Sequence, residues 1–119
     1  MKAGSLFRTN PSGFPAILKS MVLEVAILNV LEDRVSEFQA AFVRAQDIIA
    51  SMSGYRGHEL QRCIEKPNRF LLLVRWEDLE SHTLGFRNSP EYQDWKELLH
   101  SFYDPFPEVE HYTLIQDGT

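Results

Sequence analysis

The chain reads FLLLVRW at residues 70–76 and EDLESHTLGFRNSPEYQDW at residues 77–95. The first run is apolar at odd and even positions alike, which predicts a strand with both faces covered. The second run predicts a short helix that carries one histidine, His82, and then a helix that begins at Ser89 and Pro90. In a chain of 119 residues, its own helices can cover only one face of the sheet. We therefore expect a second protein chain to cover the other face.

The remaining elements follow from the spacing of apolar residues and from turn signals. In the short helix, Asp78 is the expected cap, and Leu79, His82 and Phe86 are expected on one face. The predicted elements, in order, are strand 22–30, helix 35–52, strand 55–65, strand 69–76, short helix 78–86, helix 90–102 and strand 109–115. The order β-α-β-β-α-β predicts an α+β, ferredoxin-like fold, with one antiparallel sheet and two helices on one face.

Composition is that of a single globular domain. A net charge of −5 argues against binding to a phosphate backbone, and no apolar run approaches the length of a membrane span. The single cysteine, Cys63, excludes an internal disulfide and suits a reducing compartment, so we expect a cytoplasmic protein. Residues 1–20 show no period, and we expect an N-terminal arm or disordered leader there, before a domain at 21–119. An alternative is that Met21 is the translation start.

The chain carries no strong catalytic motif: no glycine-rich phosphate loop, no G-x-S-x-G elbow and no H-E-x-x-H. The four histidines are scattered at positions 58, 82, 100 and 111, so no metal site is predicted. His82 is a candidate base, because its helix face points it towards the sheet and its intrinsic pKa suits proton transfer near neutrality. The alternative is a core histidine with a backbone partner.

Asn29 is a second candidate, because it lies late in an apolar strand and a buried amide must find partners. In a pocket it could orient a carbonyl or hydroxyl group; at a strand end it could equally bond its own loop. Aromatic residues at helical spacing after residue 85 are typical of a pocket for a flat ligand, or of plain core.

Three segments carry a resemblance: Val74-Arg75-Trp76-Glu77 at a strand end, Ser89-Pro90-Glu91-Tyr92 at a helix start, and Val109-Glu110-His111-Tyr112. With the element order, they make the chain resemble the antibiotic biosynthesis monooxygenase family over about residues 21–116. The resemblance implies a dimer in which two sheets pack face to face as an α/β barrel. It also implies a ligand cavity between each sheet and its helices. Members include cofactor-free oxygenases of polyketide anthrones and quinols, haem-degrading oxygenases and a signal-molecule isomerase.

The haem-degrading branch has an asparagine on the first strand, and a tryptophan and a proximal histidine on the second helical region. Asn29 matches the asparagine, but Phe86 falls at the tryptophan and Lys96 at the histidine, with His100 one turn later. The cofactor-free branch binds a substrate that is readily deprotonated, and the substrate carbanion then reacts with dioxygen.

The resemblance therefore implies a monooxygenase without cofactor or metal, acting on a quinol, anthrone or phenolic substrate. The expected roles are His82 as base, Asn29 as oxyanion or carbonyl partner, and four aromatic side chains as pocket walls: Trp76, Phe86, Tyr92 and Trp95. Alternatives are an isomerase of a small carbonyl compound, a ligand-binding module without chemistry and a haem-binding protein.

Overall fold

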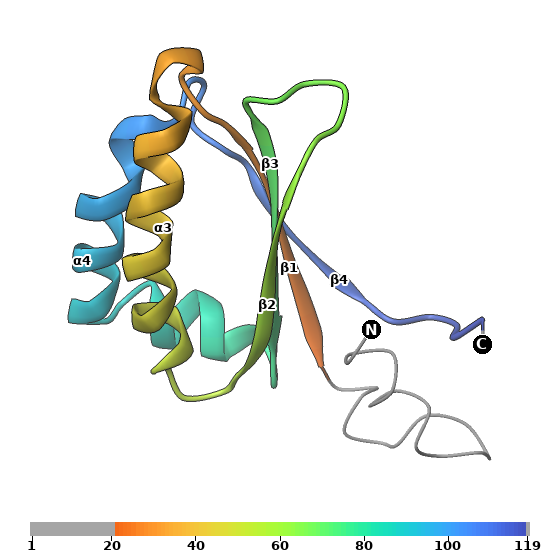
Figure 1. Ribbon diagram of the computed structural model, residues 1–119. Helices are drawn as coiled ribbons and strands as arrows, with labels where there is room; N and C mark the ends of the chain where they lie inside the picture. Colours follow the sequence, from red (N-terminus) through yellow and green to blue (C-terminus); the bar gives the residue numbers. More distant parts are fainter. Residues whose placement is uncertain (1–20, 119) are drawn as a thin grey trace.

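The computed structural model describes residues 21–118, so the expected arm at residues 1–20 lies outside the described residues. The predicted order β-α-β-β-α-β is confirmed (Figure 1). The elements are β1 (Val22–Asn29), η1 (Glu32–Arg34), α3 (Val35–Ala50), β2 (Tyr55–Arg62), β3 (Arg69–Trp76), η2 (Ser81–Phe86), α4 (Pro90–Leu99), η3 (His100–Phe102) and β4 (Val109–Thr113). The strands form one sheet in the order β2-β3-β1-β4, and every neighbouring pair is antiparallel.

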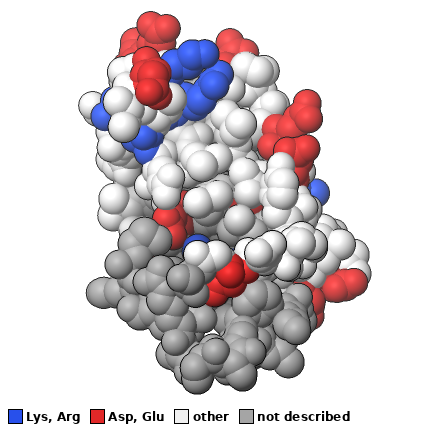
Figure 2. All heavy atoms as spheres, turned by 90° about the vertical axis from the view of Figure 1, so that its right-hand side faces the viewer, with Lys and Arg blue, Asp and Glu red and all other residues white. Residues whose placement is uncertain are grey.

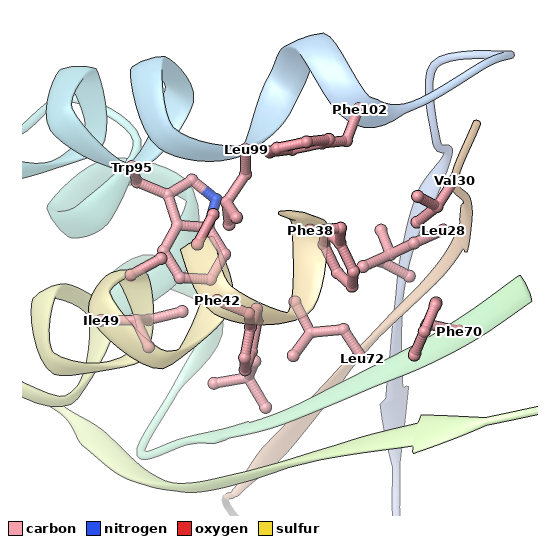
Figure 3. Packing of buried hydrophobic residues seen from close by; sticks show 14 of the residues in the cluster. Leu28, Val30, Phe38, Phe42, Ile49, Phe70, Leu72, Trp95, Leu99 and Phe102 are labelled. Carbon is pink, nitrogen blue, oxygen red and sulfur yellow. The ribbon is translucent and has the colours of Figure 1, made fainter. Parts of the chain in front are cut away.

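Both long helices cover the same face of the sheet (Figure 1). On β3 the buried residues alternate with half-buried ones, so Phe70, Leu72, Val74 and Trp76 face the helices. Helix α3 contributes Phe38, Phe42, Ala45 and Ile49 to this core, and α4 contributes Trp95 and Leu99. Figure 3 shows several of these side chains meeting between the two layers, among them Phe38, Phe42, Phe70, Leu72, Trp95 and Leu99. The predicted 3-4 spacing of both helices is therefore the spacing of their buried faces.

Within residues 21–118, no helix lies over the opposite face of the sheet (Figure 1). The odd-numbered residues of β3, among them Leu71 and Leu73, are only half-buried, and Ile27 on β1 is 47% exposed. Figure 2 shows this face as largely uncharged across its middle, with acidic and basic side chains nearer its ends. Of the two apolar faces of β3, one is thus covered by the chain's own helices, and the other is left uncovered by the elements of residues 21–118.

The short helix before α4 differs from its prediction. It is a π-helix over Ser81–Phe86, in which the Arg87 N–H donates to the His82 carbonyl. Its wider turn buries His82 and Phe86 together. Leu79 precedes this helix and is 41% exposed, so the prediction that it shares their face was wrong.

Two predicted caps are confirmed. Asp78 Oδ1 accepts hydrogen bonds from the Ser81 N–H at 2.8 Å and from the Ser81 hydroxyl at 2.7 Å. Ser89 Oγ accepts from the Tyr92 N–H at 3.2 Å, with Pro90 at the first helical position of α4. The observed ends of β2 and β4 fall before the predicted ones, at Arg62 and Thr113.

Gly54 sits where the turn after α3 meets the start of η2. Its φ is +85°, and a Cβ there would overlap Ser81 Oγ and lie 2.6 Å from Ser81 Cβ. We expect Gly54→Ala to lower the free energy of unfolding by about 1–3 kcal/mol, from backbone strain and displacement of Ser81. Chemical denaturation measures this. Gly57→Ala is the control, because Gly57 also has a positive φ, +127°, but open space around it. Equal losses in both variants would contradict a role for the close approach to Ser81.

Candidate active site

A cavity of about 490 Å³ lies between the helix-covered face of the sheet and the segment from η2 to β4. This is where the resemblance places a ligand. The sheet contributes Glu24, Ala26 and Leu28 from β1 and Leu72 from β3. The rest of the wall consists of Arg87, Tyr92, Trp95, His100, Tyr103, Phe106, Pro107, Glu108 and Val109. A flat apolar ligand would therefore meet aromatic rings on the helical side and one carboxyl group on the sheet side.

Glu24 is the buried ionisable group of this wall. It alternates along β1 with Ala26 and Leu28, so it faces the helices, and it is only 5% exposed. Trp76 Nε1–H donates to Glu24 Oε1 at 2.9 Å, and His82 Nε2 lies 3.3 Å from the same oxygen. Among the described residues no hydrogen bond reaches Glu24 Oε2, and this oxygen is not sealed in the core. One oxygen is thus held by the protein, and the other is free for a ligand.

The pKa of Glu24 is raised to about 7. Burial is the main cause, and it outweighs the hydrogen bond from Trp76 and the positive charge of Arg87, which both lower the pKa. A carboxyl group with a pKa near 7 can both accept and donate a proton at neutral pH. Glu24 therefore has the burial and the pKa that acid–base chemistry requires.

His82 lies behind Glu24, as seen from the cavity. It is 3% exposed, its ring stacks on Trp76 with centroids 5.4 Å apart, and its Nδ1 is 2.8 Å from Nε2 of His111. Burial, then the charge of Arg87 and the neighbouring His111, lower the pKa of His82 to about 3. The ring is therefore neutral near pH 7, and its 3.3 Å contact with Glu24 Oε1 is not an ion pair. His82 points towards the sheet as expected, but Glu24, and not His82, lines the cavity.

Asn29 lies on the other face of the sheet. It follows the buried Leu28 on β1, and its Oδ1 accepts a hydrogen bond from Arg69 Nε at 3.0 Å. The expectation that Asn29 lies in the pocket was wrong, because a step of one residue along a strand reverses the side-chain direction. Asn29 bonds a neighbouring strand and is not in the cavity wall.

The four predicted wall residues divide into two pairs. Tyr92 and Trp95 line the cavity. Trp76 and Phe86 are 0% and 2% exposed and form the layer behind it, with the Phe86 ring 5.7 Å from that of Trp95. This second pair fixes the wall and the polar groups without meeting the cavity.

Sequence reasoning missed several groups of the site. Glu24 carried a usable signal, since it is the one charged residue among the helix-facing positions of β1. His111 is the cross-strand partner of Glu24 on β4, so it shares the same face. Arg87 is exposed at the cavity, and its charge lowers the pKa of Glu24, His82 and His111. Pairing register and long-range charge are not visible in a single sequence.

The described residues contain neither a candidate metal centre nor a membrane-spanning helix. Within residues 21–118, no three side chains of His, Cys, Asp or Glu come together in a way that could hold a metal ion. In the same part of the chain, no helix combines the length and apolarity that crossing a membrane requires.

Comparison with known proteins places this arrangement in a family. The sequence model of the antibiotic biosynthesis monooxygenases matches residues 21–98. The chain belongs to this family. The match covers β1 through most of α4, and so includes Glu24, Trp76 and His82.

One relative and two solved structures illustrate what this chain is similar to. The uncharacterized protein YczJ of Bacillus subtilis (strain 168) is 54% identical over 92 residues, which cover 77% of this chain and 97% of that protein. The crystal structure of a putative antibiotic biosynthesis monooxygenase from Bordetella bronchiseptica is 31% identical in sequence, with a TM-score of 0.78. The match covers 82% of this chain and 99% of the Bordetella chain. SnoaB, a cofactor-independent oxygenase from Streptomyces nogalater, has a TM-score of 0.73, with 82% of this chain and 96% of that one covered. At 21% identity, the likeness to SnoaB shows a shared fold.

Proposed function

We propose that this chain is a cofactor-independent monooxygenase of a small aromatic substrate, such as a quinol, an anthrone or another phenolic compound. The observation that carries the proposal is the buried carboxyl of Glu24, with a pKa near 7, in the wall of a cavity lined by aromatic rings. Tyr92 and Trp95 offer apolar surface to a flat ring. Family membership and the fold shared with SnoaB support the same reaction class.

In the proposed reaction, ionised Glu24 takes a proton from the activated position of the substrate through its free oxygen, Oε2. The positive charge of Arg87 at the cavity favours the substrate anion that results. The anion gives its electrons to dioxygen, a C–O bond forms, and the peroxide takes back the proton from Glu24. Loss of water from the hydroperoxide then leaves a carbonyl group, so that one oxygen atom enters the product and the other leaves as water.

Dioxygen uptake tests the proposal. The full chain, treated with a chelator, is assayed against hydroquinones, anthrones and catechols, and the product is analysed after reaction in labelled dioxygen. We expect uptake with at least one class and one labelled oxygen atom in the product. No uptake with any class, or uptake that disappears with the metal and returns on its addition, would contradict the proposal.

An isomerase of a small carbonyl compound is the second candidate. Glu24 favours it as well, because a group with a pKa near 7 can move a proton between two carbons without any oxidant. Turnover without dioxygen distinguishes the two, since the isomerase retains full activity under argon and the oxygenase has none. A bound ligand that is never converted would instead support a binding module.

Haem binding depends on His100, which is the histidine in the cavity wall. Its ring packs against Phe106, with centroids 4.8 Å apart, and faces the cavity together with Tyr103. Haem would supply an iron centre for oxygen chemistry, and His100 would be its ligand. A Soret shift on titration with haemin that is lost in His100→Ala would support this alternative over the cofactor-free one.

The uncovered face of the sheet supports a homodimer as part of this proposal. It is apolar across its middle, and it holds a hollow of about 280 Å³ lined by residues that include Leu23, Tyr112 and Leu114. An apolar patch of this kind on a soluble protein is typical of an interface. A partner sheet packed on it would leave the catalytic cavity, on the other face, open to substrate.

Ile27→Asp tests the dimer. We expect a charge in the middle of the uncovered face to turn a dimer into a monomer at micromolar concentration, as measured by sedimentation velocity. The control is Val43→Asp on the outer side of α3, where Val43 is 62% exposed, and it should leave the mass unchanged. A wild-type monomer, or a dimer that survives in Ile27→Asp, would contradict the proposed interface.

A further inference from the structure

Three ionisable side chains form a continuous line of contacts from the cavity to the edge of the sheet, in which His82 and His111 are hydrogen-bonded and His82 and Glu24 are in close contact. Glu24 Oε1 lies 3.3 Å from Nε2 of His82, and Nδ1 of His82 lies 2.8 Å from Nε2 of His111. Each side chain comes from a different element: β1, η2 and β4. Because both nitrogens of His82 are engaged, this ring links Glu24 directly to His111.

The line runs from the interior to the exterior. Glu24 and His82 are 5% and 3% exposed, whereas His111 is half-buried on β4, an edge strand of the sheet. His111 is paired with Glu24 across β1 and β4, so it faces the helix side and not the proposed dimer face. Its Nδ1, the ring nitrogen not bonded to His82, is the outer end of the line.

The line is compatible with two protonation states in which both rings stay neutral. With Glu24 ionised, His82 Nε2–H donates to Glu24 and His111 Nε2–H donates to Nδ1 of His82. With Glu24 protonated, its O–H donates to Nε2 of His82, and His82 Nδ1–H donates to Nε2 of His111. The states differ by one proton. If a proton binds Nδ1 of His111, the Nε2–H of His111 can move to His82, and the Nε2–H of His82 can move to Glu24.

Burial and the nearby positive charge of Arg87 keep the proton from resting on the rings. Burial is the larger cause of the lowered pKa of both His82 and His111, and Arg87, which follows η2, lowers the pKa of both further. Trp76, packed on His82 from β3, cannot be protonated. The other titratable groups that face Glu24 across the cavity are Tyr92, His100, Tyr103 and Glu108. Burial lowers the pKa of His100 and raises that of Tyr103, so both are neutral near pH 7.

We propose that His82 and His111 are a proton path between Glu24 and solvent, which sets the protonation state of Glu24 while a ligand fills the cavity. The use of Glu24 on a substrate rests on the proposed function, but the path itself is a property of these three side chains. His82 and His111 are therefore positioning residues that act through Glu24.

The first test needs no substrate. In protein labelled with ¹⁵N-histidine and ¹³C-glutamate, NMR follows the Glu24 carboxyl and both ring nitrogens of each histidine from pH 5 to pH 9. We expect His82 and His111 to exchange the nitrogen that carries hydrogen, at the same midpoint as the titration of Glu24. Glu24→Gln should hold His82 in the Nε2–H form throughout, because the amide oxygen in the place of Oε1 accepts from Trp76 and can accept from His82 Nε2–H as the ionised acid does. Fixed ring nitrogens in the wild type, or conversion of either ring to imidazolium in step with Glu24, would overturn the path.

The second test uses turnover. His111→Gln keeps a donor for Nδ1 of His82 but cannot pass a proton on, and we expect it to lower turnover by about 10²-fold, the lower end of positioned proton transfer. In His111→Ala, added imidazole should restore turnover, because it replaces the missing proton carrier. It would not restore turnover if the defect were merely structural. His58→Gln is the control, because His58 is a half-buried histidine bonded to Tyr55 and Gln46, outside the path.

The two tests separate the path from the proposed function. If wild type consumes no dioxygen but the ring nitrogens exchange with the titration of Glu24, the path stands and the oxygenase fails. If wild type is active, and His111→Gln matches it and the ring nitrogens are fixed, the path fails and the oxygenase stands.

Discussion

Glu24→Gln is expected to lower turnover by about 10²–10⁴-fold, which is the usual contribution of a positioned acid or base. Glutamine keeps the volume of the side chain, and its amide oxygen in the place of Oε1 can accept from Trp76 Nε1–H and lies within reach of His82 Nε2. Only the ability to gain and lose a proton disappears. Oxygen uptake at saturating substrate measures the effect on turnover.

Glu24→Gln should also gain stability relative to the wild type as the pH rises. Burial raises the pKa of Glu24 from 4.5 to about 7, so between these values the folded protein binds more protons than the unfolded chain. The contribution of Glu24 to stability therefore falls as pH rises through this window, by up to about 3 kcal/mol in all. Glu24→Gln lacks this term, and denaturation at pH 5 and pH 8 should show the variant gaining on the wild type as pH rises.

The contribution of His82 to the free energy of unfolding changes with pH in the opposite direction, and it is present in both the wild type and Glu24→Gln. The pKa of His82 is lowered from 6.5 to about 3, so its contribution rises with pH through that window and cancels in the comparison. Glu108→Gln is the control for turnover, because Glu108 lies in the same cavity wall but is exposed. Full activity in Glu24→Gln would remove Glu24 from the chemistry, and a similar loss in Glu108→Gln would point to a general effect of charge on binding.

The fold could be predicted because its signals are local and repeated. Strand β3 matches its predicted bounds, Arg69–Trp76, since a run of apolar residues between a turn and an acidic pair has few alternatives. Ser89 and Pro90 fix the start of α4 through a cap and a preset φ, both of which depend on adjacent residues alone. The π-helix at Ser81–Phe86 was not predicted, because its wider turn depends on packing against the sheet and on the close approach of Gly54.

The site could be predicted only in part, for a physical reason visible on β1. Asn29 and Glu24 both interrupt an apolar strand. One has an odd number and the other an even number, so their side chains face opposite sides of the sheet. The even-numbered Ala26 and Leu28 indicate that Glu24 faces the helices, and this signal could have singled it out. His82 could be found because the face of a helix on which a residue lies follows from the spacing of its neighbours in the sequence. Its contacts with Glu24 and His111 depend on which strands the topology places beneath η2, and a single sequence does not reveal these.

Trp76→Ala is expected to lower the free energy of unfolding by about 3–5 kcal/mol, the usual cost of removing a large buried aromatic ring. Trp76 is 0% exposed at the end of β3, and its ring stacks on His82 and lies 6.0 Å from that of Phe86. Its removal would leave a void under η2, the segment that carries His82. Denaturation by urea measures the loss, and it should exceed that of Gly54→Ala.

Trp76→Phe separates this packing role from the hydrogen bond to Glu24. Phenylalanine retains most of the buried apolar area but lacks the N–H that donates to Glu24 Oε1 at 2.9 Å. Because that hydrogen bond lowers the pKa of Glu24, its loss should raise the pKa above about 7 and move the rising limb of the pH–rate profile to higher pH. Trp76→Phe should therefore lose less stability than Trp76→Ala but show a displaced titration of Glu24. An unmoved titration in Trp76→Phe would mean that the hydrogen bond from Trp76 does not set the pKa of Glu24, and that Trp76 supports the site only through its packing.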